Sequence, residues 1–257
     1  MKKLLVLLAT VLCLMAFTEA SQAKSLDRAM ISFTFDDGSN SLLLAQPILT
    51  KCQISGTAFI VPSWIGDGEH LTWDQLWTYY WKYGWEIGNH SFSHQHLPTL
   101  TDAQIQAELE AAQDAFLQHG LVGSGAFAPP YGEYDNRVVN ALKMVGFVTS
   151  SRQAWTEDSA FNDPATFNEW AINVVSIRKS TTYTTIKSLI DQAVSGKKLL
   201  VLVIHEMAQY PIDEYEMSTS VLTQVANYVN SLRISGKIDP VTISKGVGKM
   251  LYYQSLP

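Results

Sequence analysis

The sequence predicts an α/β fold in which parallel strands alternate with helices and curl into a barrel. From Asp27 onward, short apolar runs typical of buried strands alternate with segments that have the 3.6-residue period of a helix. The number of these units favours a closed barrel, although an open doubly wound sheet would also place a site at the carboxyl ends of its strands. No linker, charge run or repeat interrupts the pattern, so a single domain is the simpler interpretation.

The N-terminus predicts a secretory signal peptide over residues 1–23. Two lysines precede an apolar run from Leu4 to Phe17, and Ser21-Gln22-Ala23 has the small-x-small pattern of a cleavage site. The run has about fourteen residues, fewer than the roughly twenty of a membrane span, so a single-span anchor is the second interpretation. Cleavage would leave a domain of residues 24–257 with no stable membrane span, either secreted or held in the periplasm or cell envelope.

The composition excludes several classes of protein. Cleavage would remove two lysines and one glutamate and take the formal net charge from -6 to -7, which argues against nucleic acid as a partner. Of the two cysteines only Cys52 would remain, so neither an internal disulfide scaffold nor a zinc-thiolate site is expected. Stability must therefore come from the core of one domain.

The predicted elements follow one another in regular order. Strands are expected at 30–35, 57–61, 85–89, 125–128, 147–151, 171–177, 199–205 and 240–243. Helices are expected between them at 42–52, 72–83, 102–119, 136–145, 184–195 and 218–233. Such alternation gives parallel strands with right-handed crossovers, so polar residues at the strand ends should meet at one edge.

Two adjacent carboxylates, Asp36 and Asp37, end the first predicted strand. Successive strand side chains point to opposite faces, so both acids can reach one site only where the strand ends and turns, and Gly38 permits that turn. Adjacent carboxylates repel unless a positive charge lies beside them. The pair therefore predicts a metal ion or an Arg/Lys partner.

Two imidazoles, His90 and His94, follow the third predicted strand at a spacing that places them on one side of a helical turn. A His-x-x-x-His pattern alone is a weak signal, but with a carboxylate it gives the set that holds a catalytic zinc or similar ion. The second carboxylate would then take a proton from metal-bound water. His205, at the end of an apolar strand, is either a second proton-transfer group or a structural histidine.

Four segments together resemble the ordered motifs of the polysaccharide deacetylase family, the NodB-homology carbohydrate esterases of family 4. They are Thr34-Phe35-Asp36-Asp37-Gly38, His90-Ser91-x-x-His94, Pro130-Tyr131-Gly132 and the apolar run into His205. The resemblance spans residues 30–243. It implies a distorted (β/α) barrel that removes N-acetyl groups from an N-acetylhexosamine polysaccharide such as chitin, peptidoglycan or poly-N-acetylglucosamine.

The resemblance also implies a role for each motif residue. These roles are one divalent metal on Asp37, His90 and His94, a general base at Asp36, a general acid at His205, and substrate contacts at Pro130 and Tyr131. A metal and a fixed backbone amide near Tyr131 would stabilise the negative charge that forms on the acetamide oxygen. Zinc is the default because it is common, and cobalt or nickel also fit.

Two departures from the family pattern lie near the proposed base. Ala128 occupies the position where the family often has an arginine that pairs with the base, and the usual acidic-and-tryptophan motif reads Ser-Ser-Arg-Gln-Ala-Trp at 150–155. We hypothesise that Arg152 reaches Asp36 from a neighbouring strand end and restores the charge. The altered pair is similar to that of exopolysaccharide deacetylases acting on poly-N-acetylglucosamine. Trp155, like Trp64, is a candidate sugar platform in a loop.

Two other functions stay open. The loss at Ala128 allows a carbohydrate-binding protein that kept the pocket and lost most of its turnover. The same water-activating groups would also serve an O-acetyl esterase or a hydrolase of small cyclic amides. The predicted signal peptide favours a polymer outside the cytoplasm over a small metabolite.

Overall fold

The computed structural model describes residues 24–123, 125–152 and 159–256. The predicted signal peptide and Trp155 lie outside these residues, and the division into a leader and one domain stays a prediction. Among the described helices, none combines the length and the apolar character that crossing a membrane requires.

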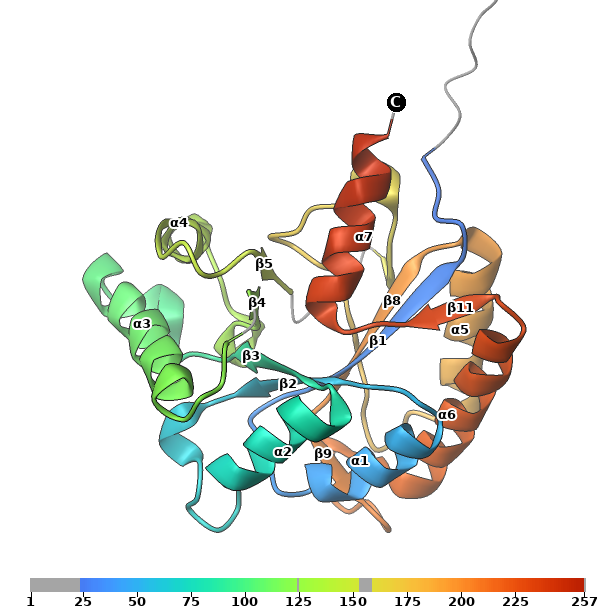
Figure 1. The fold of residues 1–257 in the computed structure, drawn as a ribbon, viewed down its shortest axis with the longest axis horizontal. Coiled ribbons are helices and arrows are strands. Elements are labelled where there is room, and N and C mark those ends of the chain that lie inside the picture. Colours follow the sequence, from blue (N-terminus) through green and yellow to red (C-terminus); the bar gives the residue numbers. More distant parts are fainter. Residues whose placement is uncertain (1–23, 124, 153–158, 257) are drawn as a thin grey trace, which may run out of the picture.

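One curled sheet of parallel strands organises the molecule, as Figure 1 shows. In spatial order its main strands are β5 (Ser150–Ser151), β4 (Ala126–Phe127), β3 (Glu86–Asn89), β2 (Thr57–Ile60), β1 (Ala29–Phe35) and β8 (Leu199–Ile204). β1 is central because it pairs with β8 along most of its length. Its first half also pairs with β11 (Ile238–Pro240), and its second half with β2. The end of β1 is therefore held from both sides.

The two edges of the curled sheet approach each other near the end of β5. β7 (Val175–Ser176) lies parallel to β8, and β6 (Phe161–Asn162) lies antiparallel to it. An isolated parallel bridge joins Arg152, directly after β5, to Ile172, shortly before β7. The predicted distorted barrel is confirmed. Where its two edges meet, the strands have only two residues each and a single bridge joins them. A separate pair, β9 (Glu206–Ala208) and β10 (Glu216–Ser218), follows β8.

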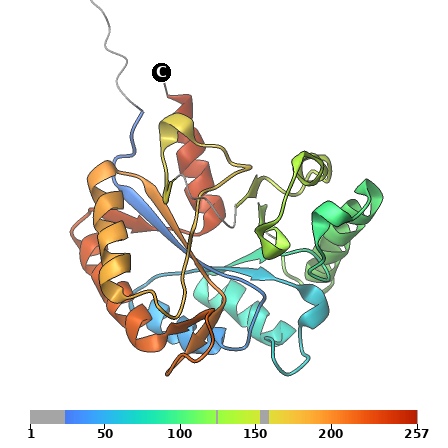
Figure 2. The ribbon, with the colours of Figure 1, turned by 180° about the vertical axis from the view of Figure 1, so that it is seen from behind.

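The helices surround the sheet, as the views from opposite sides in Figures 1 and 2 show. They are α1 (Leu42–Lys51), α2 (Trp73–Tyr83), α3 (Asp102–Gln118), α4 (Asn136–Met144), α5 (Tyr183–Gly196), α6 (Thr219–Ile234) and α7 (Ile243–Ser255). α2 and α3 each begin with a capping box, in which Thr72 pairs with Gln75 and Thr101 with Gln104. The first six helices lie where the sequence predicts them, within two residues at each end.

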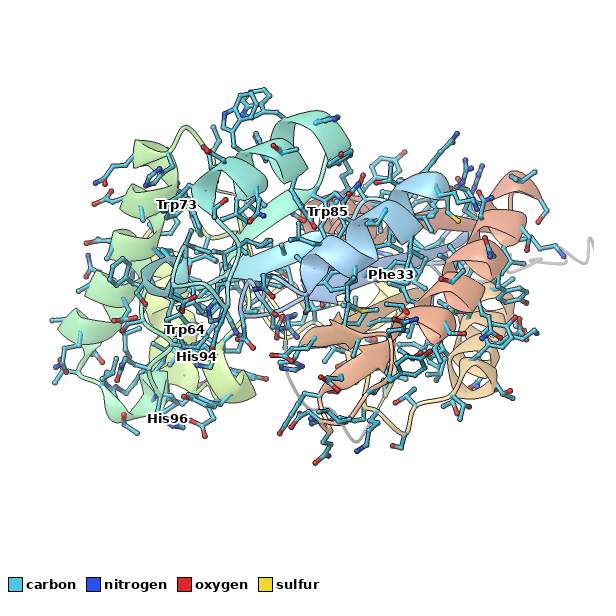
Figure 3. The ribbon with its side chains drawn as sticks, turned by 90° about the horizontal axis from the view of Figure 1, so that it is seen from below. Phe33, Trp64, Trp73, Trp85, His94 and His96 are labelled. Atoms are coloured by element: carbon cyan, nitrogen blue, oxygen red, sulfur yellow. The ribbon has the colours of Figure 1, made fainter. Side chains whose placement is uncertain are left out.

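Alternate residues of β8 enter two different cores, as the two-residue period of a strand requires. Leu200 and Leu202 join the larger cluster, which the outer helices cover, with Phe33 of β1 and Trp85 among its members (Figure 3). Leu199 and Val201 face the opposite way and join a second cluster with α7. Burial of each such side chain contributes about 1.5 to 3 kcal/mol, so both faces of the central strands are fixed.

The last part of the chain corrects one prediction. The strand expected at 240–243 is wrong in position, because the strand is Ile238–Pro240 and α7 begins at Ile243. The sequence contains a helical stripe here, with buried Ile243, Val247 and Met250, that the expected strand ignored. The strand expected at 171–177 shrinks to β7, and β6, β9 and β10 are too short to give a periodic signal.

Candidate active site

The turn after β1 directs both carboxylates into one cleft. The Asp36 amide still donates to the Ile204 carbonyl at 3.0 Å, which continues the β1–β8 ladder. Asp37 then has a left-handed backbone with φ 69°, and Gly38 follows with φ 82°. The expected turn is therefore made by Asp37 as well as by the glycine. A left-handed residue with a Cβ is strained and persists where its surroundings hold it, which is common at functional sites.

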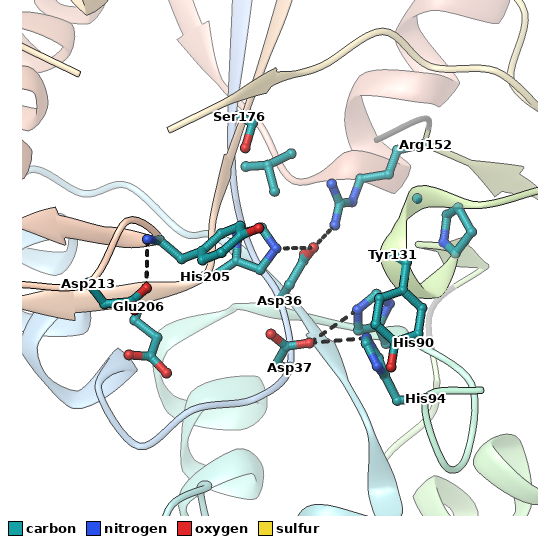
Figure 4. A pocket seen from close by; sticks show the side chains of 14 residues that line it. Asp36, Asp37, His90, His94, Tyr131, Arg152, Ser176, His205, Glu206 and Asp213 are labelled. Carbon is teal, nitrogen blue, oxygen red and sulfur yellow. Dashed lines mark hydrogen bonds and ion pairs between the residues drawn. The ribbon is translucent and has the colours of Figure 1, made fainter. Parts of the chain in front are cut away.

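Asp37, His90 and His94 converge on one point, as Figure 4 shows. Asp37 Oδ1 lies 3.3 Å from His90 Nε2 and 3.5 Å from His94 Nε2, and the three candidate ligand atoms lie within 4.8 Å of one another. Asp37 Oδ1 is buried and accepts no hydrogen bond from the described residues. A buried oxygen without a hydrogen bond beside two imidazole nitrogens fits a divalent cation.

The histidine loop is held by its own hydrogen bonds. His90 Nδ1–H donates to the Ala128 carbonyl at 2.6 Å, which fixes the tautomer and leaves Nε2 for a metal. Ser91 Oγ accepts a hydrogen bond from the His94 amide at 3.0 Å. Ser91 and His94 both have left-handed backbones, with φ 60° and 58°, and residues 90–94 form no helix. The helical turn expected for this pair is wrong: a strained loop brings the imidazoles together.

A buried ion pair joins Arg152 to Asp36. The Arg152 guanidinium donates to Asp36 Oδ2, and the two side chains are only 3% and 5% exposed. The guanidinium also lies over the Phe59 ring, 4.9 Å from its centroid. The contact expected from the sequence is present, while its catalytic role stays a proposal. Loss of one partner from such a buried pair leaves an uncompensated charge.

His205 lies on the other side of the same carboxylate. Its Nε2 is 3.8 Å from Asp36 Oδ2, and its ring meets Tyr215 edge to face at 5.3 Å between centroids. Burial lowers the pKa of His205 more than the charges of Asp36 and Asp37 raise it. The imidazole is therefore neutral at neutral pH in the metal-free protein, so a role as general acid requires a proton from a neighbour.

The titration of the metal-side residues follows from their burial and mutual charge. Burial lowers the pKa of His94 to about 4, with a further lowering by His90. Burial also opposes the charged form of His90, but the close contact with the Asp37 carboxylate and the negative charges of Asp36 and Asp37 raise the pKa of His90 above its usual value. For Asp37, burial raises the pKa, but the close contact with His90 and the charge of that imidazole outweigh burial, so the net pKa is lowered. Without metal, a proton on His90 stabilises the site.

The cleft has a volume of about 660 Å³. It is lined by Asp36, Asp37, His90, His94, Pro129, Tyr131, Gly132, Arg152, Ser176, Val203, His205, Glu206, Asp213 and Tyr215. Of the predicted substrate contacts, Tyr131 lines the cleft and is 49% exposed, whereas Pro130 is buried and its neighbour Pro129 takes that place. Trp64 packs against His94, 4.9 Å between ring centroids, and is absent from the lining.

Three residues that line the cleft opposite the histidines could not be predicted from the sequence. They are Ser176, Asp213 and Tyr215, from β7 and from the connection between β9 and β10. These segments have no clear period and follow no recognisable motif. Glu206 could be expected only because it follows His205 directly.

The comparisons with known proteins agree with this geometry. The family model described as polysaccharide deacetylase matches residues 23–150. Chitin deacetylase 2 of Cryptococcus neoformans var. grubii is 25% identical over 143 residues, which are 54% of this chain and 29% of that protein. A bifunctional xylanase/xylan deacetylase of Cellvibrio japonicus is 28% identical over 172 residues, 63% of this chain and 24% of that protein.

Among solved structures, a peptidoglycan deacetylase from Bacillus subtilis shares the fold, with a TM-score of 0.56 at 20% identity. The alignment covers 87% of this chain and 92% of that one. The matched part of this chain spans less than half the length of each of the two curated relatives above.

Proposed function

Because this chain belongs to the polysaccharide deacetylase family, we propose that it hydrolyses N-acetyl groups of an N-acetylhexosamine polysaccharide with metal-activated water. One observation carries the proposal. Asp37, His90 and His94 present three ligand atoms to one point, and beside them the Asp36 carboxylate is fixed by Arg152. A metal-binding carboxylate and a separate proton acceptor are the two parts that hydrolysis by activated water needs.

The donor set fits the metal that the family requires. Asp37 Oδ1, His90 Nε2 and His94 Nε2 would hold the ion, and two nitrogens with one carboxylate oxygen suit zinc, with cobalt and nickel as alternatives. A bound divalent ion would polarise the acetyl oxygen and make a bound water more acidic. The Ala128 carbonyl would keep His90 in the ligating tautomer.

The residues of this chain can carry the proton through the reaction. Asp36 accepts the proton of the attacking water while Arg152 keeps its carboxylate in place. His205, 3.8 Å from Asp36 and neutral at rest, receives that proton and passes it to the leaving nitrogen. The C–O bond to the water oxygen forms, the C–N bond breaks, and acetate and a free amine result. An amide of the Tyr131 turn would stabilise the oxygen that becomes negative.

The cleft suits a sugar polymer. Tyr131 and Tyr215 place aromatic rings at its walls, and such rings pack against sugar faces. We propose chitin-like, peptidoglycan-like or poly-N-acetylglucosamine-like chains as substrates. The site of action would lie outside the cytoplasm, in the envelope or medium, because residues 1–23 have the pattern of a signal peptide.

Acetate release by the purified protein tests the substrate class. The substrates are N-acetylglucosamine oligomers, poly-N-acetylglucosamine, peptidoglycan and acetylated xylan, each with zinc added after chelation. We expect acetate from N-acetylated polymers at a higher kcat/KM than from xylan. Acetate from xylan alone would identify an O-acetyl esterase. Sugar binding with no acetate under zinc, cobalt or nickel would identify a binding protein.

A further inference from the structure

His96 and Glu133 lie just outside the site and form a clamp on Tyr131. The rings of His96 and Tyr131 stack face to face, with centroids 3.9 Å apart and an angle of 6° between planes. His96 Nδ1 lies 2.8 Å from Glu133 Oε2, so the carboxylate orients the imidazole. Figure 3 labels His96 on the side of His94 away from Trp64, and the His96 side chain is half exposed. From the sequence, His96 is expected in a loop two residues beyond His94, with a contact to substrate as the alternative.

The clamped residue has a backbone that needs support. Tyr131 has φ 56° and ψ 3° within the turn Pro130–Gly132, and Gly132 follows with φ 68°. A left-handed conformation is unfavourable for a residue with a Cβ, because the Cβ comes too close to the following carbonyl oxygen. Contacts of the Tyr131 side chain must therefore help to keep this turn, and with it the direction of its amides, in one conformation.

The Tyr131 side chain also connects this turn to the histidine loop, residues 90–94, which is called the metal-side loop below. The Tyr131 ring meets the His94 ring edge to face, with centroids 4.5 Å apart. Farther along, Arg137 of α4 donates to the Leu100 carbonyl at 2.6 Å and to Asp102 Oδ1 at 2.8 Å. The chain from His94 to Asp102 is thus joined at two places to the chain from Tyr131 to Arg137.

Exposure argues against a general stabilising role for the pair. The side chains of His96 and Glu133 are 52% and 47% exposed. An exposed ion pair contributes little to folding, because water and salt screen the two charges. What the pair does provide is the orientation of one flat ring against Tyr131.

We propose that His96, oriented by Glu133, is a positioning residue that holds the left-handed Tyr131 turn against the metal-side loop. The effect on turnover rests on the proposed deacetylase function, because that function assigns an oxyanion-binding amide to this turn. The effect on the turn itself does not. The stacking surface of the ring is the important property. Phenylalanine at position 96 should therefore still hold the Tyr131 turn, and alanine should not.

Hydrogen exchange measured by mass spectrometry on peptides spanning 129–134 tests the clamp without any assay of activity. We expect His96→Ala to speed exchange in this segment about tenfold, His96→Phe to stay near the original protein, and Glu133→Gln to fall between them. His119→Ala is the matched control, since His119 stacks on Trp73 at 3.9 Å and 7°, remote from the cleft lining. It should leave peptides 129–134 unchanged.

Kinetics of the zinc-loaded variants test the consequence. We expect His96→Ala to lower kcat about tenfold with KM and zinc affinity within about twofold, and His96→Phe to restore most of kcat. Unchanged exchange in His96→Ala, equal damage in His96→Phe, or a loss of zinc affinity in step with kcat would overturn the proposal. If the unaltered protein releases no acetate, the proposed function fails, whereas the exchange result still decides whether the clamp exists.

Discussion

The two sides of the cleft are built differently. On the metal side, Asp37, His90 and His94 come from the part of the chain that matches the family, residues 23–150, and hydrogen bonds from nearby residues orient the imidazole loop. On the far side, Arg152 and His205 lie beyond that match. His205 Nδ1 is buried there and has no hydrogen-bond partner among the described residues. The side that the family model matches carries the three candidate ligands, and the other side carries Arg152 and His205.

The hypothesis that Arg152 takes the place of an arginine at position 128 has a geometric basis in the sheet. β4 and β5 lie side by side in register, with Phe127 opposite Ser151, so Ala128 and Arg152 come next on neighbouring strands. The Arg152 amide donates to the Phe127 carbonyl at 3.1 Å and keeps this register one residue further. The register therefore places residues 128 and 152 beside each other, and the guanidinium of Arg152 reaches Asp36 from the second position.

The metal side should show the largest effect. Asp37→Asn removes a charged ligand, so we expect zinc affinity to fall at least about a hundredfold and acetate release to be lost. A titration of zinc against a chromogenic chelator measures this. Asp114→Asn, at an exposed position on α3, is the control and should keep full affinity. A zinc affinity of Asp37→Asn equal to that of the original protein would show that Asp37 is not a metal ligand.

Asp36, the carboxylate that Arg152 and His205 share, should affect the rate of hydrolysis without affecting zinc affinity. Asp36→Asn leaves the three ligands in place but cannot accept a proton, so we expect kcat to fall about 10² to 10⁴-fold with zinc affinity retained. Steady-state kinetics and the same chelator titration separate the two quantities. A parallel loss of both would mean that Asp36 is a ligand.

Arg152 tests the far side. Arg152→Ala leaves Asp36 buried without its cation, so we expect the free energy of unfolding to fall by about 3 kcal/mol or more. Turnover should fall as well, because the carboxylate that accepts the proton loses the guanidinium that holds it in place. Arg137→Ala, which breaks an exposed ion pair with Asp102, should cost less than about 1 kcal/mol. Unchanged turnover in Arg152→Ala would refute the hypothesis that Arg152 takes the place of an arginine at position 128.

The smallest expected effect is a change of zinc affinity with pH, caused by the proton on His90. Since the pKa of His90 is raised, the metal-free site holds a proton there at pH values below that pKa, and zinc must displace it. That proton stabilises the folded metal-free protein below the unfolded pKa of histidine, and the contribution disappears as pH rises through the folded pKa. Zinc affinity should therefore increase over the same rise in pH. Calorimetric titrations in two buffers of different ionisation enthalpy should show proton release below this pKa and none well above it.

Local patterns explain why the metal side was the easier one to predict. The β1 run and the spacing of His90 and His94 are short-range features, and they identified the convergent residues. The conformations that achieve the convergence, left-handed at Asp37 and His94, depend on tertiary contacts that no residue type specifies. Arg152 was predicted to contact Asp36 only because the family resemblance exposed a missing charge.

The remaining parts depend on long-range packing. α7 was missed because the apolar residues after Pro240 fit a strand as well as the start of a helix. Pro129 lines the cleft in place of Pro130, which is buried directly before the left-handed Tyr131, and no local pattern distinguishes the two prolines. Asp213 and Tyr215 enter the cleft on a connection between two three-residue strands, where the sequence has no periodic signal.

The most direct test of the account is acetate release from N-acetylglucosamine oligomers by chelated protein, by the same protein after zinc is restored, and by zinc-restored Asp36→Asn. The account predicts no acetate in the first case, release in the second, and near-complete loss in the third although zinc stays bound. Equal release by the chelated and zinc-restored proteins, or by Asp36→Asn, would contradict the proposed cooperation of the metal side with the shared carboxylate.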